Sequence, residues 1–529
     1  MTTAHPSPKQ NKIARWFAGA GLIAILFAPS LWMLAAIPPL WKDVDAYVQV
    51  TDAPGIATIL HYEPVYCFAA RIPLFVGNLF DCLRAGAPLP GFDFFANPVL
   101  GDTGVFLLLI GQHLSLLWGS LCIIRTASQS ALVRILLAIL WASNPLFYAF
   151  AHCVGSETLS LILLLFLAGA GWRILGEGLV RRKRTWMLFA ILLLASSLTR
   201  HLNLVLAALL PSAFLLTANR RFLEPLPDRQ SSRSQVSLDL QRASLAILLG
   251  IACLATAGLT LRALSDAAGI PYHSRYGFTF LWRLGFLGSL PPETRSQLFD
   301  HLKARSPADV RAVLEQLRKE FPFEGKNWDI LAFAEKLRAA RYPEPNAKTE
   351  ADLGLLLNRT AFQFWWPPEP NLIAAARKDF AKSLASRPSD VVEHLFRSTT
   401  FYFEHPDWMP QAANLKTFRN RTARDVLADL RQHRYFRQWK NCRYRTLFFV
   451  SLGGLVTLAA IGGVKNIELI SYALTLTLVG LLMMFLNCLV TEFQPRFTQP
   501  MWVLTIISAT IVFGRLGDWL TARSRAFPG

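Results

Sequence analysis

The chain has 529 residues, of which 53% are hydrophobic and only 17% charged, and its mean hydropathy is +0.33. This composition is typical of a membrane protein. The formal net charge of +19 also invites a nucleic-acid interpretation, but the sequence contains no zinc-ligand spacing, helix-turn-helix cue or aromatic RNA-binding motif. In a membrane protein, excess Lys and Arg are expected in cytoplasmic loops and beside anionic lipid, so no nucleic-acid partner is predicted.

Apolar stretches long enough to span a bilayer, or nearly so, occur ten times along the chain. The first follows Lys9, Lys12 and Arg15 and is too long for the apolar core of a cleaved secretory signal. We therefore predict an all-α polytopic membrane protein with about ten transmembrane helices and an inserted helical domain. The predicted spans are residues 16–38, 103–124, 131–151, 157–176, 186–199, 202–217, 244–264, 446–464, 468–490 and 500–519.

The basic residues orient these spans, because Lys and Arg are retained in short cytoplasmic loops. With the N-terminus inside, the cytoplasmic loops include the run Arg181 to Arg184 and the Arg-rich segment 218–243, whereas the short outer loops are poor in basic residues. We expect a multi-pass protein of the plasma (inner) membrane with both termini cytoplasmic. The cation-rich stretch Arg431 to Arg445 disagrees, but long outer segments cross the membrane largely regardless of charge.

This topology divides the chain into three parts. Residues 1–264 form an N-terminal membrane part of about seven spans, in which 41–102 is the first outer loop. Residues 265–445 form an extracytoplasmic domain, and residues 446–529 form a three-span membrane part. Helical periodicity interrupted by Pro-rich breaks predicts that the extracytoplasmic domain is helical.

Arg200 and His201 interrupt the apolar stretch 186–217. A charge at the bilayer centre costs roughly 2.5–3.5 kcal/mol, so a single helix through this point is unfavourable. Two spans joined at this pair keep the later loops on the sides that the basic residues require. Each arm has about 14 residues and is shorter than the bilayer core, so the tip of the hairpin would lie below the outer surface. Such a tip is tolerated only where protein or a water-filled cavity surrounds it.

In this topology, charged residues from separate parts of the sequence reach the outer membrane boundary. They predict a water-accessible pocket with a carboxylate base and cations for an anionic group. Each also has a simpler explanation: solvated loop acids, an acid at a helix N-terminus, or Arg side chains at lipid headgroups. The candidates are Asp43 and Asp45 after the first span, Glu157 at the start of the fourth, Arg200 and His201 in the hairpin, Arg275 after the seventh and Arg496 before the tenth, with His61 and Glu63 as weaker candidates.

The motifs around these residues resemble those of the GT-C fold membrane glycosyltransferases, a class that includes protein mannosyltransferases and aminoarabinose transferases. The motifs here are "DVDAY", "SET", "TRHLNLVLAALLP" and "PRFTQP", with Phe497 where the family often has Tyr. The resemblance covers about 1–264 and 446–529 and implies that the first outer loop continues as helices lying along the membrane. Because the family usually places its soluble domain at the C-terminus, it implies no role for 265–445.

The resemblance implies transfer of a sugar from a polyprenyl-phosphate donor to a lipid, glycan or protein acceptor on the extracytoplasmic face. Asp43 or Asp45 would be the general base, and Glu157 a second acid. Arg200, His201, Arg275 and Arg496 would bind the phosphate of the donor. No metal site is predicted, although an Asp-x-Asp pair leaves a divalent cation open as a cofactor.

Three alternatives remain open. A polysaccharide ligase or polymerase would use the same lipid-linked sugars, and a protein of this fold could have lost its activity. A transporter or scaffold for envelope glycan assembly would be non-catalytic. Transporters place ionisable residues near the midplane in broken helices with internal repeats. The spans of this sequence carry little mid-depth charge and show no repeat, which favours the transferase.

Overall fold

The computed structural model describes residues 8–51, 64–93, 98–176, 183–223, 229–274, 276–320, 330–341, 346–416, 425, 429–430, 433–462 and 466–526. Over these ranges the chain is helical apart from one pair of two-residue strands. Nine of the described helices are long and apolar enough to cross a membrane, and a bent pair brings the number to ten. The prediction of an all-α polytopic membrane protein is confirmed.

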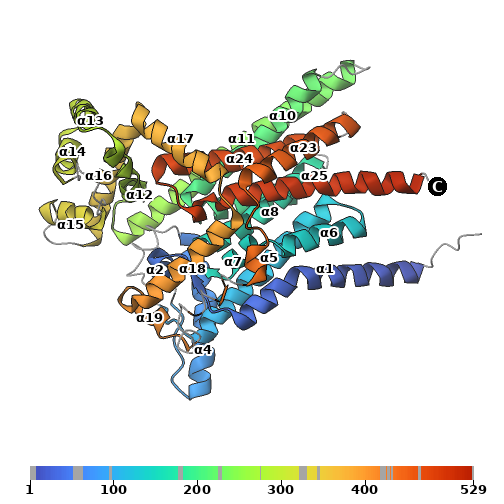
Figure 1. Cartoon of the computed structure of the whole chain (residues 1–529), viewed down its shortest axis with the longest axis horizontal. Coiled ribbons are helices and arrows are strands. Elements are labelled where there is room, and N and C mark those ends of the chain that lie inside the picture. The colour runs from blue at the N-terminus through green and yellow to red at the C-terminus, as the bar shows by residue number, and fades with distance from the viewer. Residues whose placement is uncertain are drawn as a thin grey trace, which may run out of the picture.

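Most of the membrane helices run side by side (Figure 1). Helices α8 and α25 lie at the centre, with 78% of each span buried, whereas only 28% of the α11 span is buried, so α11 presents most of its surface to lipid. The helices are α1 (Pro8–Ala36), α5 (Asp102–Ala127), α6 (Ala131–Ala142), α7 (Pro145–Ala151), α8 (Ser156–Gly176), α9 (Lys183–Ser197), the 3₁₀ helix η2 (His201–Ala208) continuing into α10 (Leu209–Leu223), α11 (Arg229–Ala268), α23 (Tyr444–Gly462), α24 (Ile467–Val490), and the 3₁₀ helix η6 (Pro495–Thr498) leading into α25 (Gln499–Ala526).

The predicted span 131–151 is broken rather than straight. Helices α6 and α7 meet at an angle of 63°. The break lies at Asn144-Pro145, where the proline cannot continue the hydrogen bonds of α6 and the Asn144 side chain caps α7 by accepting a hydrogen bond from the Leu146 N–H at 3.0 Å. The predicted break at Arg200 is also present, because α9 ends at Ser197 and η2 begins at His201.

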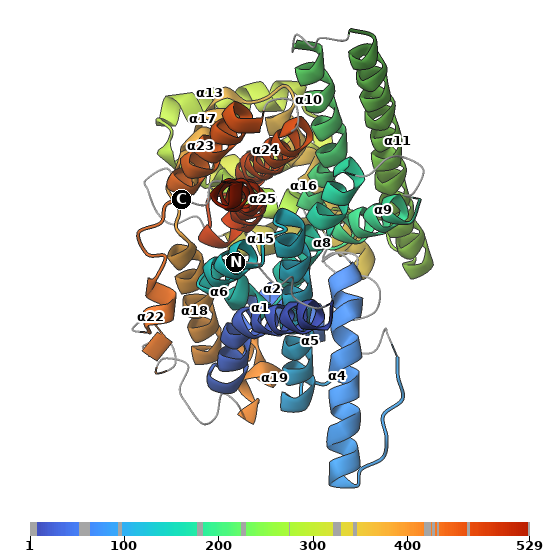
Figure 2. The same cartoon turned by 90° about the vertical axis from the view of Figure 1, so that its right-hand side faces the viewer.

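One helix in the predicted outer loop meets the length and composition of a span. Helix α4 (Pro64–Ala85) is long and apolar enough to cross a membrane. It nevertheless runs across the direction of α25 in both views (Figures 1 and 2). This is the orientation of a helix that lies along the membrane surface.

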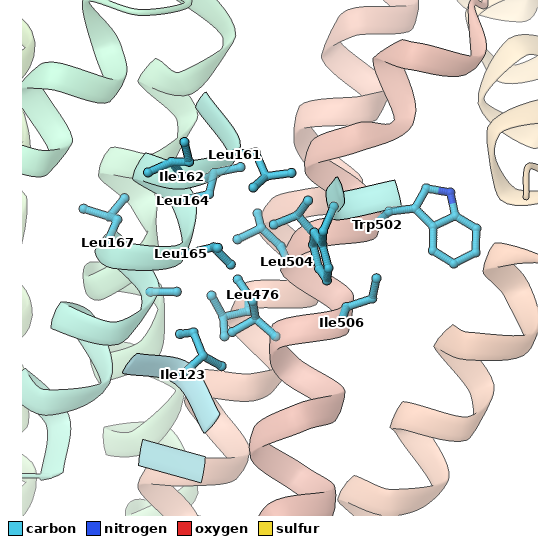
Figure 3. Close-up of a cluster of buried hydrophobic side chains, with 14 of the residues drawn as sticks. Ile123, Leu161, Ile162, Leu164, Leu165, Leu167, Leu476, Trp502, Leu504 and Ile506 are labelled. Atoms are coloured by element: carbon cyan, nitrogen blue, oxygen red, sulfur yellow. The ribbon is translucent and has the colours of Figure 1, made fainter. Parts of the chain in front are cut away.

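The core of the membrane part lies where α5, α8, α24 and α25 meet (Figure 3). Leu and Ile side chains fill it, and hydroxyl groups join the helices by hydrogen bonds, which is usual where lipid replaces water outside. The Tyr444 hydroxyl lies 2.8 Å from the Thr505 hydroxyl, and the Trp141 indole N–H donates to Thr510 at 2.8 Å. Helix α25 is therefore held to both α23 and α6.

Helix α1 begins and helix α25 ends at the same end of the bundle (Figure 1). The start of α1 and the end of α25 are on the right of Figure 1, and the helices inserted after α11 gather on the left. The inserted elements are α12 (Tyr276–Arg283), η3 (Leu284–Ser289), α13 (Pro292–Arg305), α14 (Ala308–Glu320), α15 (Ile330–Arg341), α16 (Ala347–Trp365), α17 (Pro370–Leu384), α18 (Pro388–Glu404), η4 (Pro406–Trp408), α19 (Pro410–Ala413) and α22 (Arg434–Arg437).

Helices α17 and α18 pack against the membrane helices. Helix α17 contacts α24, and α18 contacts α7 and η6. The Trp365 indole N–H of α16 donates to the Leu489 carbonyl of α24 at 3.2 Å. Within the insert, Asp379 of α17 pairs with the buried Arg283 of α12. The insert is thus joined to the ends of the spans and is in position to take part in a site there.

Close packing of α4 on α5 depends on two glycines. A Cβ added at Gly77 would overlap the backbone of Gly104, which cannot move aside within a helix. We expect Gly77→Ala to displace α4 and lower the thermal unfolding temperature of the detergent-solubilised protein. Gly111→Ala on α5 is the control, because its Cβ would meet nothing within 4 Å. Equal unfolding temperatures for the two variants would contradict this packing.

Candidate functional site

A two-residue strand pair brings distant parts of the sequence together. Strand β1 (Leu40–Trp41) lies parallel to β2 (Cys153–Val154), with Leu40 opposite Cys153 and Trp41 opposite Val154. The carboxyl ends of parallel strands lie at the same edge, so the residues that follow β1 meet those that follow β2. These are Lys42 and Asp43 on one side and Gly155, Ser156 and Glu157 on the other.

Five charged side chains form a connected set at this edge, here called the charged cluster. Lys42 Nζ lies 2.9 Å from Glu157 Oε1 and 3.9 Å from Asp43 Oδ1. Arg200 Nη2 lies 3.7 Å from Glu157 Oε1, and Arg496 Nη1 forms an ion pair with Asp43 Oδ2. All five side chains are between 2% and 16% exposed. Three cations thus face two carboxylates in a largely desolvated place.

Local structure fixes the Asp43–Arg496 pair. Asp43 precedes α2 (Val44–Thr51) and caps it, because its Oδ1 accepts a hydrogen bond from the Ala46 N–H at 3.0 Å. Arg496 lies in η6, where its Nε donates to Gln494 Oε1 at 3.0 Å and its Cζ lies 4.9 Å from the centre of the Phe497 ring. The amide of Gln494 and the ring of Phe497 therefore orient the Arg496 guanidinium toward the Asp43 carboxylate.

Backbone contacts fix Glu157 at the start of α8. The Gly155 N–H donates to the Tyr66 hydroxyl at 2.7 Å, the Ser156 N–H donates to Gln49 Oε1 at 3.2 Å, and Gln499 Nε2 donates to the Glu157 carbonyl at 3.2 Å. The neighbours of Glu157 thus come from α2, α4 and α25. Glu157 lies in the first turn of α8, where an acid favours the helix N-terminus. Its carboxylate nevertheless contacts Lys42 and Arg200 of the charged cluster.

The cluster retains unused hydrogen-bonding capacity. Within the described ranges, Glu157 Oε2 is buried and accepts no hydrogen bond. Among the same residues, the Arg200 guanidinium contacts Glu157 at 3.7 Å, beyond hydrogen-bond distance, and has no closer polar partner. The cluster therefore offers an acceptor oxygen and several N–H donors to a bound molecule.

The structure brings four of the sequence-predicted residues into one cluster: Asp43, Glu157, Arg200 and Arg496. Of the others, Asp45 lies in the first turn of α2. Burial raises the pKa of the nearby Tyr402 phenol, and the negative charges of Asp43 and Asp45 contribute to the rise.

Of the remaining candidates, the structure describes His201. His201 turns its ring toward Tyr276 of α12, with ring centres 5.3 Å apart. Arg275, His61 and Glu63 lie outside the described residues. The catalytic and binding roles of all these residues stay predictions.

Sequence reasoning missed two contributors, Lys42 and α18. Lys42 is an ordinary boundary cation in the sequence, and only its place next to Asp43 in "WKDVD" connects it with the site. From α18, the Ser398 hydroxyl donates to the Lys42 carbonyl, and Thr399 Oγ1 accepts from the Trp41 N–H at 2.9 Å. No sequence pattern links α18 to strand β1, because the two are more than 300 residues apart.

The donor set does not fit a divalent cation bridging Asp43 and Glu157. Such ions need several oxygen ligands at about 2.0–2.6 Å. Here the Lys42 ammonium lies between the two carboxylates, and Arg496 takes the second oxygen of Asp43. Across the described residues, no group of three or more His, Cys, Asp or Glu side chains is placed to hold a metal ion. The set is suited instead to binding an anion and accepting a proton.

Gly155 leaves room for the Lys42–Glu157 contact. Its φ of +148° lies in the region that favours glycine, and an added Cβ would lie 3.2 Å from Lys42 Cδ and 3.3 Å from Glu157 Oε2. We expect Gly155→Ala to cost about 1–3 kcal/mol of stability. Gly86→Ala is the matched control, because Gly86 has a φ of +63° but open space around its Cβ. Thermal unfolding should show the larger loss for Gly155→Ala, and the reverse order would contradict it.

The charged cluster also predicts a pH dependence through His394 of α18. Burial, followed by the positive charge of Arg496, lowers the pKa of His394 to about 4; Arg397 adds to this, and Asp43 and Glu157 oppose it. An unfolded histidine has a pKa of about 6.5, so the native state binds fewer protons between these values. Stability should be intact above about pH 6.5 and fall as the pH drops toward 4. Thermal unfolding at several pH values should show a smaller acid loss for His394→Gln, and an unchanged slope would contradict this.

No family model matches the chain, and no curated protein matches its sequence. Among solved structures, the chain is similar to the archaeal oligosaccharyltransferase AglB from Archaeoglobus fulgidus in complex with an inhibitory peptide and a dolichol-phosphate. The identity is 12% over 97% of this chain and 53% of that chain, with a TM-score of 0.41. The apo form of the A. fulgidus oligosaccharyltransferase gives 12% identity over 97% and 52% of the two chains, with a TM-score of 0.42.

The chain therefore spans about half the length of these solved structures. Both solved structures are described as archaeal oligosaccharyltransferases.

Proposed function

We propose that the chain is an integral membrane glycosyltransferase that moves a sugar from a polyprenyl-phosphate donor to an acceptor on the extracytoplasmic face. The observation that carries the proposal is the buried cluster itself. A carboxylate, Asp43, touches a cation, Arg496, and a second cation, Arg200, reaches the cluster with N–H groups that no described residue accepts. General-base catalysis and stabilisation of a phosphate leaving group need this combination.

The reaction assigns a role to each group. A hydroxyl or amine of the acceptor attacks the anomeric carbon and gives its proton to Asp43, or to Asp45 in the first turn of α2. The bond between that carbon and the phosphate oxygen breaks, and its electron pair stays on the lipid phosphate. Asp43 is favoured as the base because it contacts Arg496, which would bind that phosphate. The base and the leaving group would then both lie next to the anomeric carbon.

Arg200 and Arg496 would hold the departing phosphate through charge-assisted hydrogen bonds. The cluster is at most 16% exposed, and low exposure strengthens such contacts by lowering the effective dielectric constant. Glu157 holds Lys42 and Arg200, and its Oε2, which accepts no hydrogen bond from the described residues, is available to a sugar hydroxyl. His201 and Arg275 are proposed to complete the phosphate site.

The proposed orientation puts both termini in the cytoplasm of a cell with a plasma (inner) membrane. The cluster lies next to α18, away from the end where α1 begins and α25 finishes (Figure 1). Four exposed basic residues precede or begin α23, where lipid headgroups would contact them: Arg434 of α22, Lys440, Arg443 and Arg445. A headgroup-binding role would account for cations on the outer side.

The proposal predicts that Asp43→Asn abolishes transfer in a protein that still folds but unfolds at a lower temperature, because Arg496 loses its charge partner. Asparagine still caps α2, so the substitution removes the base and spares the helix start. Loss of a general base should lower transfer by about 10²–10⁴-fold. Mass spectrometry of lipid-linked sugars and envelope glycans measures this in cells that lack the gene and carry the wild-type or variant chain.

Asp266→Asn is the matched control, because Asp266 is an exposed carboxylate at the end of α11. Cells with this control should have wild-type glycans, whereas cells with Asp43→Asn should accumulate the donor. Unchanged transfer by Asp43→Asn/Asp45→Asn would remove the base from this loop. The acceptor found in the wild type also separates a simple transferase from a polysaccharide ligase or polymerase.

A further inference from the structure

We propose that the Lys42 ammonium takes the place of a divalent cation between Asp43 and Glu157, so that this site works without a metal ion. The catalytic half of this inference rests on the proposed function. The half that concerns metal binding does not, because it follows from the position of one side chain.

The position of Lys42 is the first argument. Its Nζ lies 2.9 Å from Glu157 Oε1 and 3.9 Å from Asp43 Oδ1, and its side chain is only 8% exposed. Lysine is rarely buried unless its charge is paired, so this burial depends on the two carboxylates. A cation that bridged them would have to displace the ammonium.

The surroundings of Lys42 are built to keep it there. The β1–β2 pairing sets its Cα at the edge of the strands, and α18 holds its carbonyl through Ser398. Gly155 lies under its stem, where even a methyl group would approach Cδ to 3.2 Å. Three features therefore favour one conformation of the Lys42 side chain: the strand pairing, the hydrogen bond from Ser398 and the space left by Gly155.

The charges around the carboxylates give the second argument. Arg496 pairs with Asp43 and Arg200 approaches Glu157, so the two carboxylates already face three positive charges. An added divalent cation would be repelled by all three. Lys42 thus acts as a positioning residue: it neutralises the acids and fixes the distance between them.

The first test measures metal binding to the purified full-length protein in lipid nanodiscs, with Mn²⁺ as the probe. We expect the wild type to show no Mn²⁺-dependent rise in unfolding temperature and no bound-Mn²⁺ signal in electron paramagnetic resonance. Lys42→Met should lower the unfolding temperature and gain Mn²⁺ binding, and Lys42→Met/Glu157→Gln should lose that binding again. Lys42→Arg keeps a cation, so it should bind no Mn²⁺ and stays informative if Lys42→Met does not fold.

Two results of this test would overturn the inference. One is Mn²⁺ binding by the wild type that disappears in Asp43→Asn. The other is a Lys42→Met variant with wild-type stability and no Mn²⁺ binding, because Lys42 would then neither hold Glu157 nor fill a cation position.

The second test measures sugar transfer in membranes washed with EDTA. Transfer should equal that of untreated membranes, and a loss of about tenfold or more that Mn²⁺ or Mg²⁺ restores would overturn the inference while leaving the proposed function intact. If untreated membranes also show no transfer, the proposed function fails, and the Mn²⁺ measurements still decide whether Lys42 replaces a metal.

Discussion

The parallel pairing of Leu40–Trp41 with Cys153–Val154 is the constraint on which the rest of the site depends. Hydrogen bonds of buried polar side chains stabilise this pairing. His113 Nε2 lies 3.1 Å from His152 Nδ1, and His152 Nε2 lies 2.9 Å from the Ile37 carbonyl oxygen. The Gln112 side-chain N–H donates to the Cys153 carbonyl at 3.2 Å. An unpaired backbone or side-chain polar group at this depth is costly, so these contacts specify one register. That register decides which charged residues meet.

The charges that meet there are tolerable only as a group. A buried ion pair that loses one partner leaves an uncompensated charge, so removing one member destabilises the others. The cluster keeps one more cation than carboxylates among Lys42, Asp43, Glu157, Arg200 and Arg496. A phosphate could balance that excess without new desolvation of the protein. The same electrostatics links stability to binding, because an anionic ligand would stabilise the arrangement that binds it.

Hydropathy and the distribution of basic residues predicted the all-α membrane fold, and the cost of a mid-membrane charge located the break at Arg200. The sequence also predicted that Asp43 and Arg496 lie close together, because the assigned order of the spans places both at the outer membrane boundary. Strands of two residues carry no periodicity, so β1 and β2 could not be predicted, and the role of Lys42 was hidden with them. Composition also could not orient α4, since a surface-lying helix and a short span have similar apolar content.

The most direct test of the strand pairing is a disulfide between Leu40→Cys and the native Cys153. Paired strands lie about 4.8 Å apart, within the Cα separation that a disulfide allows. Oxidation followed by proteolysis and mass spectrometry should yield a peptide linked between positions 40 and 153, and none when Cys153→Ser is added. A cysteine at position 40 that stays alkylatable, or that links to another native cysteine, would contradict the pairing and the charged cluster built on it.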